Sequence, residues 1–281
     1  MVSEFTARHV LTIYVLAYEN SDCVRALLAS LLPLDEPNVC VVVADNSDKT
    51  YAVREVVSEM IPSFDGRLLH HSYGCNIGMG TALRPFEIVK SPYLWMVGAC
   101  NSFRPGALKA IIPVLRERKP DVLLHAENNL WRRSWVQVEQ RYDTISGLIQ
   151  AHSHSIACSI NSMIHSTEKL RPLIPVGYET LSSLVPHAAM IYEGLRTRRL
   201  EVLYLPLMVF DRHARPRAWS MLQYMENMHC LFPAITPQAD REAFFRELPQ
   251  TDAWITEEIR KLKENPAREA SWAHATIRPS T

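Results

Sequence analysis

The chain has 281 residues, and its 30 Lys and Arg residues balance 30 Asp and Glu residues, so the formal net charge is zero. That length allows one large α/β domain or two small domains with a substantial core. A neutral chain excludes a nucleic-acid-binding protein that depends on bulk positive charge, and we expect no nucleic-acid partner. The apolar runs fall well short of the roughly 18 residues that a membrane-spanning helix needs.

The amino terminus and the cysteines indicate the compartment. No basic leader with an apolar core opens the sequence, which predicts that no signal peptide directs secretion. The six cysteines form neither a CxxC pair nor a zinc-binding spacing. We therefore expect reduced, mostly buried cysteines and a cytoplasmic protein.

The first half of the chain alternates strand-like and helix-like segments. The predicted strands share apolar, often β-branched residues bounded by polar turns: 10–16, 39–44, 67–71 and 93–97. Helices are predicted between them, with Pro85 acceptable only in the first turn of its helix. This alternation predicts an α/β fold with a doubly wound, mainly parallel sheet.

Ligands of such sheets bind beyond the carboxyl ends of the strands. The loops that follow the predicted strands are 17–20, 45–48, 74–80 and 98–102. We expect these loops to converge on one site.

The second half is less regular. Strands are predicted at 121–125 and over 201–210, a helix over 182–195, and helical segments after Ala218 and over 251–264. The apolar stripe after Ala218 suits packing on the domain, a homodimer contact or a peripheral membrane contact. Its modest charge favours the first two.

Four motifs occur in an order typical of one family. They are Leu-Ala-Tyr-Glu-Asn at 16–20, Asp-Asn-Ser-Asp at 45–48, Asn-Ile-Gly at 76–78, and Gly-Ala-Cys-Asn at 98–101 followed by Pro-Gly-Ala-Leu at 105–108. In this order the chain resembles family-2 glycosyltransferases of the GT-A fold. More narrowly, it is similar to the abequosyltransferase-like branch that builds O-antigen and capsule sugars. The resemblance covers residues 10–210.

The resemblance implies a domain organisation and an activity. A GT-A domain would span 1–213, with a nucleotide-sugar half at 1–110 and an acceptor half at 111–213, before a C-terminal helical extension and mobile tail at 214–281. The implied reaction moves a sugar, with inversion, from a UDP, dTDP, CDP or GDP sugar to a hydroxyl group. The acceptor would be a saccharide or lipid-linked saccharide of polysaccharide biosynthesis, met in the cytoplasm or at the inner face of the membrane.

The resemblance also implies which residues bind the donor: Ala17, Tyr18, Glu19, Asp45, Asn76, Gly78, Ala99 and Asn101. Tyr18 can stack on a nucleobase, and Asp45 can accept a hydrogen bond from a uracil-like imide. The structural alternatives are an Asx turn at Asp45, ordinary packing of Tyr18 and a tight turn at Gly78.

In the family, aspartates at the position of residues 99–101 bind Mg²⁺ or Mn²⁺. Hard cations prefer carboxylate oxygens, whereas this chain has Ala99, the soft Cys100 and Asn101. We therefore expect weak or absent metal binding and no cofactor. The positive charge facing the diphosphate would come instead from Arg212, His213, Arg215 and Arg217. The alternative is a solvated basic loop or a contact with acidic lipid.

The family pattern places the catalytic base at His187, whose neutral imidazole can accept a proton at cytoplasmic pH. Glu179 and Asp211 are the fallback bases. A histidine bonded to the backbone at a helix start is the structural alternative.

Two other functions remain open. A GT-A-fold binding or scaffold protein could have lost catalysis together with the aspartates. A sugar nucleotidyltransferase is suggested by the Gly-rich stretch at 78–85, although that signature belongs after the first strand and one of its basic residues is missing.

Overall fold

The computed structural model describes residues 2–32, 36–47, 52–126, 136–152, 159–181 and 185–212, together with Arg260 and Glu264. The predicted helical segments after Ala218 and over 251–264 lie outside the described residues, apart from Arg260 and Glu264. The C-terminal extension at 214–281 therefore stays a prediction, and so does the division of the domain at residue 110.

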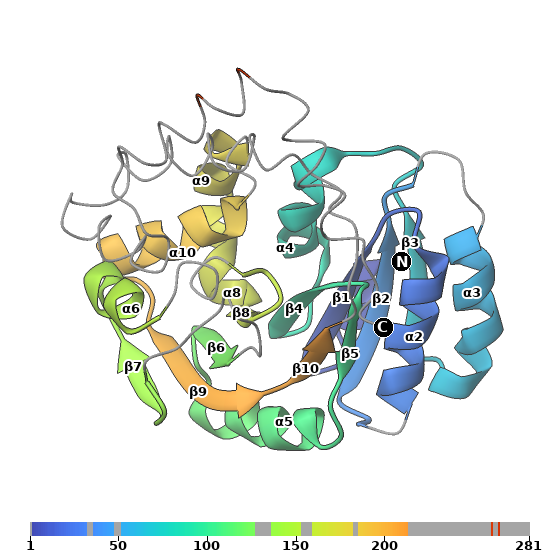
Figure 1. Ribbon diagram of the computed structural model, residues 1–281, viewed down its shortest axis with the longest axis horizontal. Helices are drawn as coiled ribbons and strands as arrows, with labels where there is room; N and C mark the ends of the chain where they lie inside the picture. The colour runs from blue at the N-terminus through green and yellow to red at the C-terminus, as the bar shows by residue number, and fades with distance from the viewer. Residues whose placement is uncertain are drawn as a thin grey trace.

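The centre of the fold is an eight-stranded sheet of order β3-β2-β1-β4-β8-β6-β9-β7 (Figure 1). Its strands are β1 (Leu11–Ala17), β2 (Val39–Asp45), β3 (Leu68–Ser72), β4 (Tyr93–Gly98), β6 (Val122–Ala126), β7 (Gln140–Tyr142), β8 (Met163–Ser166) and β9 (Val202–Met208). The first four strands of that order pair in parallel. β8 runs antiparallel to β4 and β6, β9 parallel to β6, and β7 antiparallel to β9.

Helices cover both faces of this sheet. One face packs against α2 (Ser21–Leu31), α3 (Ala52–Met60) and α5 (Ala107–Arg118). The other packs against α4 (Arg84–Ile88), α6 (Ile145–Ala151), α8 (Thr167–Leu170), α9 (Ile174–Glu179) and α10 (Pro186–Arg196). Figure 1 shows α2 and α3 side by side next to β1 and β2. Short elements complete the described chain: α1 (Val2–Thr6), η2 (Ile61–Phe64), η3 (Gly78–Ala82) and η4 (Arg171–Leu173).

Burial on both faces explains why β1 and β2 are continuous apolar runs. In β1, Ile13 and Val15 pack under α2 and α3, whereas Tyr14 between them faces the opposite core. A strand buried on both sides needs apolar residues at successive positions rather than at alternate ones. The predicted doubly wound, mainly parallel sheet is confirmed, and Pro85 lies in the first turn of α4 as expected.

One feature of the fold was not predicted. Residues 98–102 were expected to form a loop, but β5 (Asn101–Phe103) pairs antiparallel with β10 (Phe210–Arg212) as a separate two-stranded sheet. Three-residue strands carry too little periodicity to be recognised, and their pairing spans more than a hundred residues of sequence. This small sheet lies directly beyond the end of β4.

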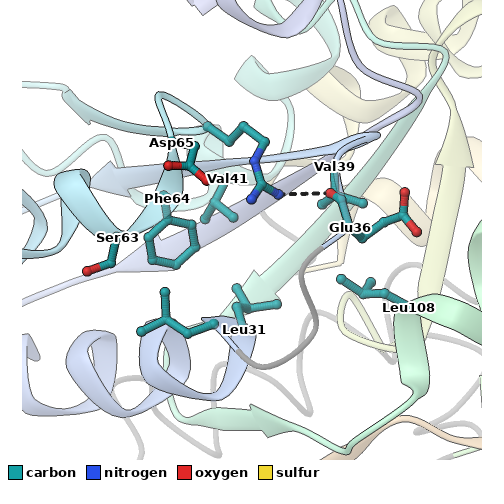
Figure 2. A pocket seen from close by; sticks show the side chains of 10 residues that line it. Leu31, Glu36, Val39, Val41, Ser63, Phe64, Asp65 and Leu108 are labelled. Carbon is teal, nitrogen blue, oxygen red and sulfur yellow. Dashed lines mark hydrogen bonds between the residues drawn. The ribbon is translucent and has the colours of Figure 1, made fainter.

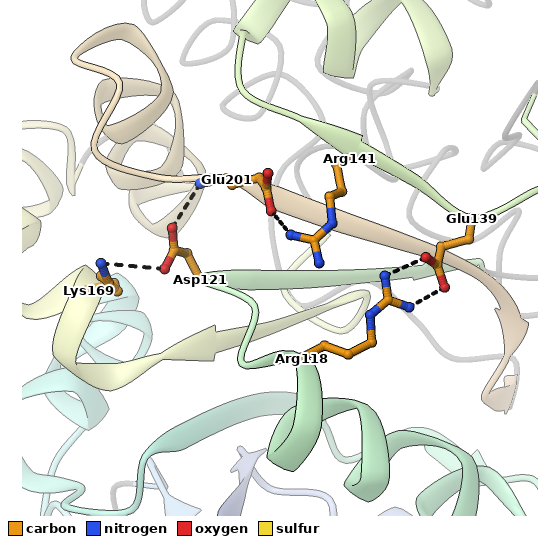
Figure 3. A network of polar contacts seen from close by, with 6 residues as sticks. All are labelled: Arg118, Asp121, Glu139, Arg141, Lys169 and Glu201. Atoms are coloured by element: carbon orange, nitrogen blue, oxygen red, sulfur yellow. Dashed lines mark hydrogen bonds and ion pairs between the residues drawn. The ribbon is translucent and has the colours of Figure 1, made fainter.

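Charged side chains surround the other end of the sheet, near the starts of β6 and β9 (Figure 3). Arg118 pairs with Glu139, Arg141 with Glu201, and Lys169 lies 3.8 Å from Asp121; these are the ion pairs drawn there. Surface ion pairs of this kind contribute at most about 1 kcal/mol each. Arg141 also places a charge on the short edge strand β7, which discourages pairing with another chain.

Candidate active site

The carboxyl ends of β1, β2 and β4 lie side by side. Ala17 pairs in register with Asp45, and Leu16 with Gly98. Beyond the strands, the N–H of Asn46 donates to the Ala17 carbonyl at 2.9 Å, and the N–H of Ala99 donates to the Leu16 carbonyl at 3.2 Å. The loops that follow these strands therefore start from one edge of the sheet.

Hydrogen bonds join these loops to the segment after β3. The Glu19 N–H donates to Ser47 Oγ at 2.9 Å, which joins the loop after β1 to that after β2. Asn76 Oδ1 accepts from Asn46 Nδ2 and from the Gly78 N–H, both at 2.8 Å. Gly78 has a φ of 57°, a left-handed conformation that glycine adopts without steric cost. The expected convergence is therefore confirmed for the described residues of the loops at 17–20, 45–48 and 74–80, and the contact of Ala99 with Leu16 brings the start of the loop at 98–102 to the same edge.

Asp45 is the buried carboxylate of this edge, only 3 % exposed. Its Oδ1 accepts from the Ser47 N–H at 3.0 Å, which forms the Asx turn considered as the structural alternative. Its Oδ2 lies 3.3 Å from Nε2 of His70 on β3. A carboxylate offers about four acceptor positions, so these two contacts do not use its full capacity to accept hydrogen bonds.

His70 was not predicted as a site residue. The only available signal was its place in a strand neighbouring the one that ends in Asp45, and pairing of β2 with β3 is a tertiary fact.

Tyr18 and Glu19 form the rim of the site. The Tyr18 side chain is 37 % exposed, and its backbone N–H donates to Asn20 Oδ1 at 2.8 Å. Glu19 has a φ of 47°, which is uncommon for a residue other than glycine and is typical of functional loops. Because the side chain of Tyr18 is exposed, its ring is available for stacking.

Residues 98–101 form the loop that corresponds to the metal position in the family that this chain resembles. Two residues of this loop are buried. Ala99 is 2 % and Asn101 5 % exposed, and Asn101 Nδ2 donates to the Gly98 carbonyl at 2.6 Å. Within the described ranges, no three His, Cys, Asp or Glu side chains gather in a way that could hold a metal ion. The residues of the loop do not fit a hard divalent cation, because they provide no carboxylate and an amide that is already engaged.

The three candidate bases lie in different environments. His187, in the first turn of α10, is 2 % exposed, and its ring centroid lies 6.4 Å from that of His165 on β8. Glu179 is an exposed residue at the end of α9. Asp211 in β10 accepts hydrogen bonds from Arg104 at 2.7 and 2.9 Å, with 62 % of its side chain exposed. The structure does not bring these residues together, and the burial of His187 favours its structural alternative.

The candidate diphosphate ligands are only partly described. Arg212 is the last residue of β10, and its backbone pairs in register with Asn101 of β5. His213, Arg215 and Arg217 lie outside the described residues.

A cavity of about 220 Å³ lies at the opposite end of β2 (Figure 2). Arg67 is one of its lining residues and donates to the Glu36 carbonyl at 2.9 Å. Its lining consists of Leu31, Leu32, Glu36, Val39, Val41, Ser63, Phe64, Asp65, Arg67 and Leu108. Because Val39 is the first residue of β2, this cavity is not the site formed by the strand ends.

The sequence matches no protein-family model and no curated protein. The structure is similar to many solved structures, among them S. aureus TarS and a mannosyltransferase. Residues 1–349 of S. aureus TarS in complex with UDP-GlcNAc give a TM-score of 0.58 at 15 % identity, covering 85 % of this chain and 71 % of that one. The mannosyltransferase PcManGT from Pyrobaculum calidifontis, in complex with GDP-Man and Mn²⁺, gives 0.59 at 12 % identity, covering 99 % and 78 %.

The chain spans only part of some of these proteins. Against S. aureus TarS in its longer form, the TM-score is 0.57 at 16 % identity, and the match covers 79 % of this chain but 38 % of that one. At such identities, structural likeness establishes the fold alone. The protein has the GT-A fold of these glycosyltransferases, a mixed α/β architecture with an eight-stranded, mainly parallel sheet.

Proposed function

We propose that the protein is a glycosyltransferase that moves a sugar from a nucleoside-diphosphate sugar to a hydroxyl acceptor. The observation that carries the proposal is the buried carboxylate of Asp45, enclosed by the loops at 17–20 and 74–78 at the carboxyl edge of a GT-A sheet. Open α/β sheets bind their ligands at this edge. The complexes of TarS with UDP-GlcNAc and of PcManGT with GDP-Man support a nucleotide sugar as the donor class.

The donor would lie across the strand ends. Tyr18 stacks on the base, and Asp45 accepts a hydrogen bond from an imide N–H of that base. The remaining proposed contacts are Ala17, Glu19, Asn76, Gly78, Ala99 and Asn101. Since Ala17 and Ala99 are buried, they act by leaving space rather than through polar groups.

The reaction needs charge neutralisation and a base. The acceptor oxygen attacks the anomeric carbon from the side opposite the diphosphate, whose bond to that carbon breaks with its electron pair, so the configuration inverts. Arg212, His213, Arg215 and Arg217 neutralise the departing diphosphate. The hydroxyl proton passes to His187 or, in its place, to Glu179 or Asp211.

The finer assignments rest on the sequence motifs. We place the protein with the abequosyltransferase-like, O-antigen and capsule branch, with weak or absent metal dependence and a saccharide or lipid-linked acceptor. A lipid-linked acceptor would bring it to the cytoplasmic face of the membrane, as a monomer or homodimer. Within the described part of the chain, no helix has the length and apolar character of a membrane span.

Thermal unfolding with UDP, GDP, CDP and dTDP, each with Mn²⁺ or with EDTA, tests the proposal. A bound ligand at a hundredfold excess over its Kd stabilises by about 2.7 kcal/mol, a shift that is readily measured. Stabilisation by one diphosphate in EDTA is expected. Stabilisation only with Mn²⁺ would reject metal independence, and no shift with any nucleotide would reject the enzyme.

The second candidate is a GT-A-fold binding or scaffold protein without catalysis. It is favoured by the 98–101 loop, where no carboxylate is present and the Asn101 amide is engaged within the loop. Diphosphate binding without any transfer or hydrolysis would support it. A nucleotidyltransferase is disfavoured because its Gly-rich stretch follows β3 rather than β1.

A further inference from the structure

The 98–101 loop is held by a residue from a distant part of the sequence. Asn161, just before β8, accepts at Oδ1 from the Gly98 N–H at 2.7 Å and from Asn101 Nδ2 at 3.3 Å. Asn101 Nδ2 also donates to the Gly98 carbonyl. The first two hydrogen bonds join both ends of the loop to one side-chain oxygen, and the third joins the two ends to each other.

The backbone carbonyl of Asn161 is itself contacted by two buried side chains. Trp95 Nε1, in a fully buried side chain of β4, donates to the Asn161 carbonyl at 2.7 Å. Nε2 of the buried His125 on β6 lies 3.1 Å from the same carbonyl. His125 Nδ1 lies 2.9 Å from the Ala126 carbonyl, so a neutral ring donates to one of these two oxygens at a time. Strands β4 and β6 thus set the position of Asn161.

The loop in turn sets the position of β10. Asn101 begins β5 and pairs in register with Arg212, the last residue of β10. The two short strands also pack on the same aromatic side chain, since the rings of Phe103 and Phe210 lie 5.2 and 5.3 Å from Trp95. The loop, the backbone of Arg212 and Asn161 therefore form one connected unit beside the proposed donor site.

We infer that Asn161 is a positioning residue of the donor site, which holds the 98–101 loop and strand β10 where they meet the diphosphate. The inference rests on the proposed function. The loop contains no carboxylate through which a bound cation could hold it in place. Hydrogen bonds therefore hold the loop, and two of them end on Asn161 Oδ1. These two hydrogen bonds hold the 98–101 loop, which in the proposed function lies beside the diphosphate. They do not involve Asp45 or Tyr18, which are proposed to bind the base.

This difference between the two sides of the site leads to a selective test. Asn161→Ala removes the acceptor of two hydrogen bonds while leaving Asp45 and Tyr18 untouched. Affinity for the nucleoside diphosphate that best stabilises the wild type should fall at least about tenfold, the scale of one or two lost hydrogen bonds to a fixed loop. Affinity for the corresponding monophosphate should change much less. Isothermal titration calorimetry with both nucleotides measures the ratio.

Asn38→Ala is the matched control. Asn38 lies at the opposite end of the sheet, where its carbonyl accepts from the N–H groups of Val10 and Leu11 and its side chain contacts Glu36 and Arg116. The Asn38→Ala variant thus loses a comparable set of side-chain contacts. Its ratio of diphosphate affinity to monophosphate affinity should nevertheless equal that of the wild type. If Asn161→Ala does not fold, Asn161→Ser replaces it in the test. The serine hydroxyl is too short to accept from both donors, so the same selective loss of diphosphate affinity is expected.

A double-mutant cycle with Asn101→Ala adds a second readout. If Asn161 acts through the loop, the losses of diphosphate affinity in the two single variants will not add in the double variant. Equal loss of monophosphate and diphosphate binding in Asn161→Ala, or no loss of either, would overturn the positioning role while the proposed function stood. A wild type that binds no nucleoside diphosphate would overturn both.

Discussion

At the scale of single residues, the proposed donor site depends on one buried charge. The Asp45 carboxylate is shielded from solvent, and the Ser47 N–H and His70 Nε2 hold its orientation. A fixed, desolvated acceptor discriminates between ligands more sharply than a solvated one, because a ligand without the matching N–H leaves it unpaired.

The first prediction concerns Asp45→Asn. This substitution keeps the side-chain shape and one oxygen for the Ser47 N–H, but it removes the charge and replaces the second oxygen by a donor. Diphosphate affinity should fall by about 1–3 kcal/mol, the cost of an unmatched buried polar group. Calorimetry measures it. Asp65→Asn, at the cavity of Figure 2 and with a φ of 48° that asparagine tolerates, is the control. Equal affinities in the wild type and Asp45→Asn would contradict the role.

The second prediction assigns the base. If His187 is the base despite its burial, His187→Ala should lower kcat for transfer or donor hydrolysis by about 10²–10⁴-fold without weakening donor binding, whereas Glu179→Ala and Asp211→Ala should keep activity. Steady-state kinetics with the donor identified by thermal unfolding measures this. Because His187 is buried, circular dichroism must show that the variant folds. Loss in Glu179→Ala or Asp211→Ala with activity retained in His187→Ala would move the base to that residue.

At the scale of elements, the two-stranded sheet of β5 and β10 is the connection between the donor site and the chain that follows residue 212. Its two phenylalanines, Phe103 and Phe210, have ring centroids 4.6 Å apart and pack against Trp95. Such aromatic contacts add to the few backbone hydrogen bonds that hold the two strands together.

The third prediction tests the basic segment that β10 leads into. If these side chains neutralise the diphosphate, Arg212→Ala and Arg215→Ala should each weaken nucleoside-diphosphate binding by more than about 1 kcal/mol, the value of a charge-assisted hydrogen bond. Arg25→Ala, which removes an exposed charge from α2 and its ion pair with Glu59, should have no effect. Unchanged calorimetric affinity in both Arg212→Ala and Arg215→Ala would exclude this source of positive charge.

At the scale of the whole molecule, the core contains neutral histidines. Burial lowers the pKa of His152 to about 4 and that of His165 to about 3, the latter also through the nearby His187. In the unfolded chain both would titrate near the ordinary histidine value, so between that value and the lowered ones the unfolded state binds more protons. The free energy of unfolding must therefore fall as the pH falls through this range.

The fourth prediction follows from that sign. Each of these two histidines should cost about 2 kcal/mol of stability between pH 7 and pH 5, at about 1.4 kcal/mol per pH unit below 6.5. Urea unfolding at the two pH values measures the difference, and His165→Gln should reduce it by the share of one group. A free energy of unfolding that is the same at pH 5 and pH 7 would show that these rings are not buried in their neutral form.

The sequence by itself determined the strands β1, β2 and β4 and the edge of the sheet where a ligand would bind. Continuous apolar, β-branched runs are local signals of strands buried on both faces, and parallel strands place their following loops together. The expectation that Asp45, Asn76 and Gly78 lie at one edge of the sheet therefore follows from local patterns.

Only the tertiary structure decided which partners these residues meet. His70 reaches Asp45 through the pairing of β2 with β3, and Asn161 reaches Gly98 from 63 residues away in the sequence. The pairing of β5 with β10 and the burial of His187 are likewise invisible in the local pattern. Periodicity reports which face of an element is buried, but the identity of the neighbour depends on how distant elements pack.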